Sequence, residues 1–246
     1  MDAGVKPDAM GTGGPGGAMS GGGGASGGGC AAGLGLCDDF ESYGEGKVPD
    51  GRWMTVKPPT SGASLTVDGS KPYSGSKSLH IKVTTGGSAN IATKPGDAAF
   101  TGITNAGYLR FMMFQTAITQ PTDTHARLVR VGNDKASAGS AGTGYAFSLH
   151  GYPKPAQLKM EAMNDIYAGK MAPVLDKWVC WEFQLGPGVM NWWMDGAKVT
   201  AALPATWPTV MLTTMEVGFE TFSSITAELW IDDLAFDSKK IGCPTK

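Results

Sequence analysis

Apolar and polar side chains alternate residue by residue along most of this chain from residue 37 onward. The alternating runs are short, Gly, Pro, Asn and Asp cluster between them, and no sustained helical period appears. Such alternation predicts β-strands with one buried and one outward-facing side. The clearest strands are expected at Ser78–Thr84, Tyr108–Gln115, Ala126–Val131, Tyr145–His150, Gln157–Met163, Trp178–Leu185, Met190–Asp195, Met215–Glu220 and Glu228–Phe236.

The alternation also assigns a face to each side chain. In the strand Trp178–Leu185, the inward set is expected to be Val179, Trp181, Phe183 and Leu185. The outward set is then Trp178, Cys180, Glu182 and Gln184. By the same rule we expect inward side chains at Tyr145, Phe147, Leu149, Trp192, Met215, Val217 and Phe219.

The strand Tyr108–Gln115 differs because it is largely apolar on both faces. We therefore expect it at the centre of a sheet, covered on both sides. Arg110 lies among these apolar neighbours, and a guanidinium in such surroundings must be paired or open onto a cleft.

Many short strands with turn residues between them predict an all-β fold of two antiparallel sheets, a jelly-roll sandwich. Residues 1–29 are Gly-rich and contain no aromatic side chain, so they are expected to form a disordered linker. Residues 30–246 are expected to form one folded domain. The pair Asp195-Gly196 is typical of a tight hairpin turn.

Composition narrows the range of functions. The formal net charge is −2 and no basic cluster occurs, so nucleic acid is not expected as a partner. No apolar run approaches the roughly 20 residues that a membrane-spanning helix requires. Four cysteines without a CxxC pair favour two disulfides, which indicate a secreted or cell-surface protein whose signal has been removed. The Gly-rich segment is compatible with a lipid-anchored tether, and we expect a monomer.

Five local motifs together resemble the concanavalin-like jelly rolls that include the fungal cellulose-induced protein and the glucuronan and alginate lyases. They run in the order the fold requires, and they indicate a fold and not an activity. The motifs are Cys37-Asp38-Asp39-Phe40-Glu41, Tyr73-Ser74-Gly75-Ser76-Lys77-Ser78-Leu79, Trp178-Val179-Cys180-Trp181-Glu182, Trp193-Met194-Asp195-Gly196 and Trp230-Ile231-Asp232-Asp233-Leu234.

This resemblance implies that the first and last strands are neighbours in one sheet. It also implies a structural Ca²⁺ site at a turn between those strands, because carboxylates and hydroxyls are suitable calcium ligands. The expected ligands are Glu41, Ser74, Ser78, Asp232 and Asp233, although solvated strand-end carboxylates would have the same sequence.

Four cysteines permit three pairings. With the first and last strands adjacent, as the resemblance implies, Cys243 is within reach of either the N-terminal region or Cys180. We favour the pairs Cys30–Cys37 and Cys180–Cys243, and the other pairings stay open.

Polysaccharide recognition uses aromatic rings that stack on sugars, together with carboxylates, amides and cations that bond to hydroxyls. The outward positions of several strands supply these groups on what we expect to be one concave sheet. A solvated sheet face without a ligand would show the same outward polarity. The expected substrate-binding residues are Trp178, Glu182, Gln184, Lys159, Glu216, Glu220 and Trp193, with His150 on the same surface.

A second hypothesis is a polysaccharide lyase that cleaves a uronic-acid polymer by β-elimination. The related jelly-roll lyases imply an Arg, Gln, His and Tyr set, but Arg110 and Gln115 fall on opposite faces by parity. The least strained trio is Arg110, His150 and Tyr152, with His150 suited to be the base. A glycoside hydrolase is disfavoured because no clustered pair of facing carboxylates is evident.

Extracellular carbohydrate recognition is therefore the leading hypothesis. The alternatives are the polysaccharide lyase and a non-catalytic structural or adhesion protein of the cell surface.

Overall fold

The structure is a computed structural model of the chain. The residues it describes are Met1, Cys30, 32–103, 106–119, 125–133, 144–150, 157–162, 166–199, 209–221 and 224–244. The predicted linker, residues 2–29, lies outside this set.

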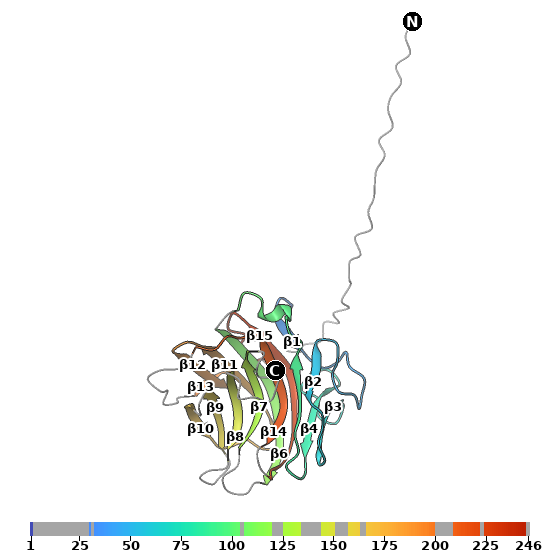
Figure 1. Cartoon of the computed structure of the whole chain (residues 1–246), viewed down its shortest axis with the longest axis vertical. Helices are drawn as coiled ribbons and strands as arrows, with labels where there is room; N and C mark the ends of the chain where they lie inside the picture. Colours follow the sequence, from blue (N-terminus) through green and yellow to red (C-terminus); the bar gives the residue numbers. More distant parts are fainter. Residues whose placement is uncertain are drawn as a thin grey trace.

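Two antiparallel sheets form a sandwich (Figure 1), as the alternation predicted. Sheet A has the strand order β13-β12-β11-β6-β15-β4-β3, with β1 also paired to β15. Its strands are β1 (Leu36–Asp38), β3 (Ala63–Asp68), β4 (Ser78–Val83), β6 (Gly107–Thr119), β11 (Trp178–Gly186), β12 (Val189–Met194), β13 (Ala197–Val199) and β15 (Thr226–Asp237).

Sheet B has the strand order β10-β9-β8-β7-β14-β5-β2. A short 3-10 helix, Ala98–Phe100, lies in the connection between β5 and β6. The strands of sheet B are β2 (Trp53–Lys57), β5 (Ala89–Thr93), β7 (His125–Gly132), β8 (Gly144–His150), β9 (Gln157–Ala162), β10 (Ile166–Met171) and β14 (Thr214–Thr221).

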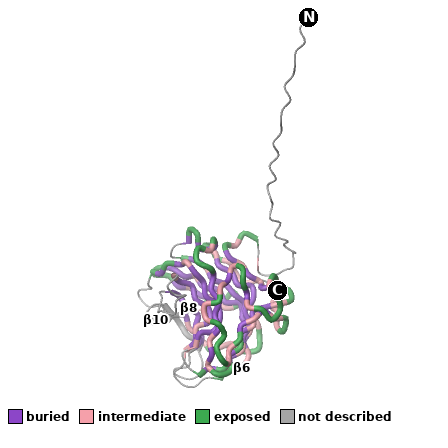
Figure 2. The backbone as a smooth tube through the Cα atoms, turned by 45° about the vertical axis from the view of Figure 1, so that its right-hand side comes forward, coloured by how far each residue is buried: buried purple, intermediate pink, exposed green. Residues whose placement is uncertain are grey.

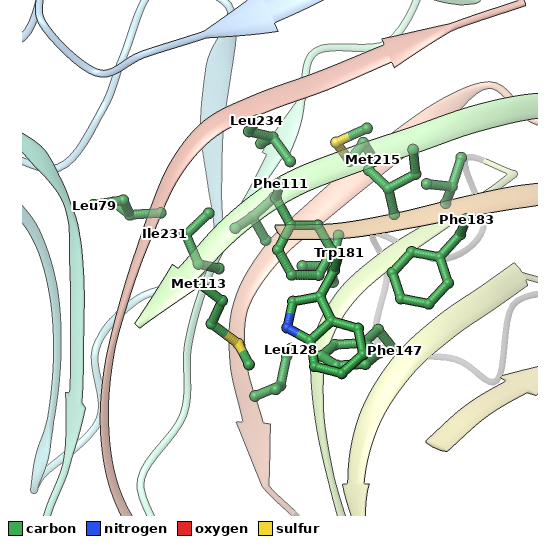
Figure 3. Close-up of a cluster of buried hydrophobic side chains, with 14 of the residues drawn as sticks. Leu79, Phe111, Met113, Leu128, Phe147, Trp181, Phe183, Met215, Ile231 and Leu234 are labelled. Carbon is green, nitrogen blue, oxygen red and sulfur yellow. The ribbon is translucent and has the colours of Figure 1, made fainter. Parts of the chain in front are cut away.

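The hydrophobic core lies between the two sheets. Figure 2 shows the buried segments of the backbone in purple, in the inner part of the folded chain. Aromatic rings from opposite sheets meet there: Phe147 of sheet B lies 5.1 Å from Trp181 and 5.5 Å from Phe111, both of sheet A (Figure 3). Trp181 in turn stacks on Trp192 at 6.0 Å. Burial of this apolar surface is the main source of stability for such a sandwich.

The predicted faces are confirmed. All the inward side chains expected from the alternation are buried, and Trp192 is 1% exposed whereas Trp193 beside it is half-buried. The strand expected at the sheet centre, β6, lies between β11 and β15. The hairpin at Asp195 and Gly196 is also present, with φ values of 50° and 79° that suit a tight two-residue turn.

All the expected strands form, with ends shifted by one to a few residues. The alternation missed β2, β3, β5, β10 and β13. In β5 every residue is buried, so this strand carries no alternating pattern for the sequence to show.

The first strand lies beside the last, because β1 pairs with β15 through Cys37 opposite Ala235. In Figure 1 these are the blue and red ends of the folded chain. The favoured disulfides are confirmed as Cys30–Cys37 and Cys180–Cys243, with Cα–Cα distances of 5.4 and 5.9 Å. Within the described part of the chain, no helix is long and apolar enough to cross a membrane.

Loss of the two disulfides is expected to have unequal effects. The Cys180–Cys243 bond closes a sequence separation of 63 residues, against 7 for Cys30–Cys37. Loop-closure entropy predicts a cost of about 4 kcal/mol for C180S/C243S and about 2 to 3 kcal/mol for C30S/C37S. Chemical denaturation of the two double variants measures the difference. An equal or reversed ranking would show that loop entropy does not control their stability.

Candidate functional site

The residues expected to line one carbohydrate surface are divided between the two sheets. Trp178, Glu182 and Gln184 lie in β11 and Trp193 in β12, all in sheet A. Lys159, Glu216 and Glu220 lie in β9 and β14 of sheet B. The expectation of a single surface was therefore wrong. Alternation tells inward from outward, but the outward sides of two sheets packed face to face point in opposite directions.

The expected lyase trio is not brought together either. Arg110 is in β6 of sheet A, His150 is in β8 of sheet B, and Tyr152 lies outside the described residues. Arg110 is 3% exposed, and its guanidinium donates to the carbonyl oxygens of Asp233 at 3.1 Å and Gly242 at 3.3 Å. Arg110 therefore links β15 to the C-terminal segment on the outer side of sheet A. Its assignment to a trio with His150 was wrong.

Glu182, opposite Arg110 in the sheet, also has a structural role. Its side chain is fully buried, and Oε1 accepts hydrogen bonds from the backbone N–H groups of Ile241 at 2.8 Å and Gly242 at 2.7 Å. The Cys180–Cys243 bond ties down the same C-terminal segment. Glu182 is thus covered by that segment, and its expected contact with substrate was wrong.

The other expected residues on sheet A are only partly open. Trp193 is half-buried, and the Nζ of Lys240 lies 4.2 Å from the centroid of its ring. Gln184 accepts a hydrogen bond from the side-chain amide of Asn191 at 2.7 Å. Trp178 lines a pocket of about 260 Å³.

Sheet B carries a denser polar cluster on the side that faces away from the core, here named the charged face. It is built by β2, β5, β7, β8, β9 and β14, whose register places these side chains side by side. The charged face comprises Lys57, Asn90, Arg127, Arg130, Ser148, Lys159, Glu216 and Glu220.

Glu220 is held by two cations on this face. It is 6% exposed, although it points away from the core. Lys57 donates to its Oε1, and the Nη1 of Arg127 lies 3.3 Å from its Oε2. Both oxygens of this carboxylate therefore accept charge-assisted hydrogen bonds, which fix its position.

Glu216 is also buried, at 5% exposure, but it is less well paired. The Nη1 of Arg130 is 3.7 Å from its Oε1, and within the described residues that oxygen accepts no hydrogen bond. Burial raises the pKa of Glu216 above its ordinary value, and the nearby charge of Arg130 only partly offsets this effect. A carboxyl group in this state is suited to exchange a proton or to bind a hydroxyl.

Bulges bring the two arginines onto one face. Arg127 and Arg130 are three residues apart, a spacing that strict alternation would place on opposite sides. The register of β7 shifts between Arg127 and Val129, so that Leu128 and Val129 both enter the core and both arginines face outward. Sequence reasoning missed Arg127 and Arg130 for this reason. The signal available was two arginines within an otherwise apolar strand.

A histidine of β7, His125, lies next to the charged face. The backbone register aligns His125 of β7 with His150 of β8, and His150 with Gln157 of β9. His125 is half-buried, one position beyond Ala126 and two from Arg127 along the same strand. An imidazole two residues from a guanidinium on the same strand is a combination that acid–base chemistry can use.

The expected calcium ligands surround a single turn. Glu41 accepts hydrogen bonds from the backbone N–H groups of Ser76 and Lys77, both at 2.7 Å. On the other side, Oδ2 of Asp232 accepts from the backbone N–H groups of Tyr73 at 2.9 Å and Ser74 at 3.2 Å.

These oxygens are already occupied by protein donors. The hydroxyl of Ser74 donates to Asp233 at 2.8 Å, and that of Ser78 donates to the carbonyl of Lys71 at 2.8 Å. No group of three or more His, Cys, Asp or Glu side chains among the described residues is arranged to hold a metal. Ca²⁺ needs six to eight oxygen ligands, so binding here would require these oxygens to exchange protein donors for the ion. Calcium at this turn stays a prediction.

Comparison with solved structures supports the fold. The "Cellulose induced protein, Cip1" superposes with a TM-score of 0.63 at 18% identity, over 85% of this chain and 99% of that chain. The receptor binding domain of botulinum neurotoxin mosaic serotype C/D reaches a TM-score of 0.47 at 12% identity, over 72% and 42%. The chain spans nearly the whole length of the former and less than half of the latter. The former likeness identifies a jelly-roll sandwich, and no argument rests on the latter.

No family model matches the sequence. No curated protein matches it either.

Two glutamates should change the pH dependence of stability in opposite directions. The folded-state pKa of Glu216 is raised, so its contribution to stability is lost as the pH rises through that pKa. For Glu41, burial alone would raise the pKa, but hydrogen bonds from Ser76 and Lys77 outweigh it and lower the pKa. Its contribution is therefore lost as the pH falls through that lowered pKa.

We expect the difference in unfolding free energy, variant minus wild type, to rise with pH for E216Q. The rise should begin near the ordinary carboxyl pKa of about 4 and extend through the raised pKa. For E41Q the difference should fall as the pH increases across the carboxyl range. Urea denaturation from about pH 3 to 8 measures both. Slopes of the same sign would contradict the contrast between these sites.

The calcium prediction can be tested by melting. If Ca²⁺ binds at Glu41 and Asp232, calcium added to EDTA-treated protein should raise the Tm by mass action. The E41Q variant should lose that response. An unchanged Tm in protein shown beforehand to be metal-free would mean that hydrogen bonds alone hold the turn.

Proposed function

We propose that this chain is an extracellular carbohydrate-binding jelly-roll protein that contacts polysaccharide across the charged face of sheet B. The observation that carries the proposal is that two nearly buried glutamates and two arginines lie on the side of a sheet that faces away from the core.

Stability alone does not account for this cluster. Desolvating charges in a buried ion pair costs about as much as their attraction returns, so such pairs are weak contributors to folding. Perturbed carboxyl groups beside fixed cations are instead common at functional sites. Carboxylates, guanidinium groups and amides in fixed positions match the donors and acceptors of sugar hydroxyls.

The fold likeness supports the same class of ligand. The similar solved structure is named for its induction by cellulose, and the two chains share a jelly-roll sandwich over most of their lengths. Fold alone does not determine function, so the proposal rests on the charged face, and the likeness supports it.

Two disulfides support an extracellular location, since such bonds persist in oxidising compartments. Residues 2–29 would then serve as a Gly-rich tether between this domain and a membrane anchor or another domain. The disulfide Cys30–Cys37 closes the N-terminal end of the folded part, where the proposed tether would begin.

A polysaccharide lyase is the second candidate, favoured by His125, which lies two residues from Arg127 in β7. In β-elimination a cation or amide neutralises the uronate carboxylate, a base removes the C5 proton, and an acid protonates the departing oxygen as the bond from C4 to that oxygen breaks. Arg127 would have the first role, and His125 would have the second. A structural surface protein without sugar specificity is the remaining alternative.

Replacing Arg127 with alanine should weaken polysaccharide binding. Loss of a charge-assisted hydrogen bond costs about 1.5 to 3 kcal/mol, or roughly 10- to 100-fold in Kd. The fold should be little affected because Lys57 still pairs with Glu220. A glycan array identifies the probe, and calorimetric titration of that probe measures Kd for wild type and R127A.

The matched control is K198A, which removes an exposed cation from β13 on sheet A. Unchanged affinity in R127A, or equal losses in both variants, would reject the charged face as the binding site. The same array hits, incubated with protein, separate the functions. Unsaturated products that absorb ultraviolet light and disappear with R127A indicate a lyase, and absence of any binding leaves the structural alternative.

A further inference from the structure

A pocket of about 260 Å³ opens on the outer side of sheet A, opposite the charged face. It lies where β6 and β11 meet the β12–β13 hairpin turn and the C-terminal segment. Its lining consists of Tyr73, Met112, Trp178, Cys180, Asp195, Cys243 and Pro244.

The walls of this pocket are fixed by covalent and hydrogen bonds. The disulfide joins Cys180 to Cys243, and the backbone N–H of Cys180 donates to the Asp195 carboxylate at 2.9 Å. On the opposite wall, the backbone N–H of Tyr73 is held by Asp232 at 2.9 Å. A preformed pocket binds a ligand without first having to order its own side chains.

Two half-buried aromatic rings form the pocket walls. Tyr73 and Trp178 meet edge to face at a centroid distance of 5.6 Å and an interplanar angle of 64°. Phe114 supports Trp178 from the next strand at 5.8 Å. Aromatic faces of this kind stack on the C–H groups of a pyranose, most readily one whose ring substituents are all equatorial.

The size of the pocket limits the ligand. Sites for drug-sized molecules typically occupy about 300 to 1,000 Å³. A pocket of about 260 Å³ is smaller, so it suits a single sugar ring rather than a length of chain.

The charge of the pocket limits the ligand further. Among the described residues that line it, Asp195 is the one that carries a formal charge, and it is exposed. No lysine, arginine or histidine is among the described residues that line the pocket. Such a lining offers no cation to pair with a uronate carboxylate, and Asp195 can accept hydrogen bonds from sugar hydroxyls, in contrast to the arginines and lysines of the charged face.

We propose that the pocket of Tyr73, Trp178 and the Cys180–Cys243 disulfide binds one neutral, gluco-configured pyranose unit, as a second sugar site on the opposite side of the molecule from the charged face. With both sites filled, one molecule would bridge two polysaccharide chains. The pocket site does not depend on the charged face, because the two share no residue.

The test uses cellotetraose as the neutral probe and the full chain in isothermal titration. W178A should weaken binding about tenfold or more by removing the stacking ring. M112F should do the same by filling the floor while leaving both aromatic walls in place. The matched control is W193A, a half-buried tryptophan of the same sheet that does not line the pocket.

The expected result is a loss of affinity in W178A and M112F, with wild-type affinity in W193A and in R127A. Retained binding in M112F and W178A, or no binding by the wild type at millimolar probe, would overturn the proposal. So would a loss confined to R127A, which would assign the neutral sugar to the charged face. The charged-face proposal itself fails separately, through unchanged binding of the array-identified probe in R127A.

Discussion

Every long strand in this protein must place one of its two faces between the sheets, and this requirement organises the rest of the molecule. The core draws rings from both layers, as in the contact between Phe147 and Trp181. Such interiors are close-packed, so the inward positions tolerate little change. Binding or catalytic sites must therefore lie on the two outer sides of the sandwich. These sides point in opposite directions and do not share residues.

These two outer sides have different characters. On sheet B, Lys57 and Arg127 hold Glu220, and Arg130 lies near a less satisfied Glu216. On sheet A, the C-terminal segment covers the polar groups. Glu182 accepts two of its backbone N–H groups, and the Cys180–Cys243 bond fastens its end. The same segment leaves an aromatic pocket at its margin, so closure of this side also creates a binding surface.

The last strand connects these features. The register of β15 against β6 shifts between Asp232 and Ala235, and Asp233 adopts a positive φ of 46°. The two buried carboxylates then reach the Tyr73–Ser74 turn, while the carbonyl of Asp233 accepts from Arg110. Burial, together with the charge of Asp233, raises the pKa of Asp232 to about 8. The bulge thus positions one wall of the pocket.

Local alternation was enough to predict most of the strands, their inward residues, the central place of β6 and the turn at Asp195-Gly196. These features depend on neighbouring residues and on the burial of one face of each strand. The order of apolar and polar residues along the chain determines which face that is. Strands without alternation escaped the prediction, as in the fully buried β5.

Tertiary structure alone decided which residues form a site. Pairing between strands far apart in sequence assigned Glu182 to one sheet and Glu216 to the other, so outward side chains of equal parity ended on opposite sides. A register shift placed Arg127 and Arg130 together against the period of two. Sheet membership and bulges arise from long-range packing, which no short window of sequence contains.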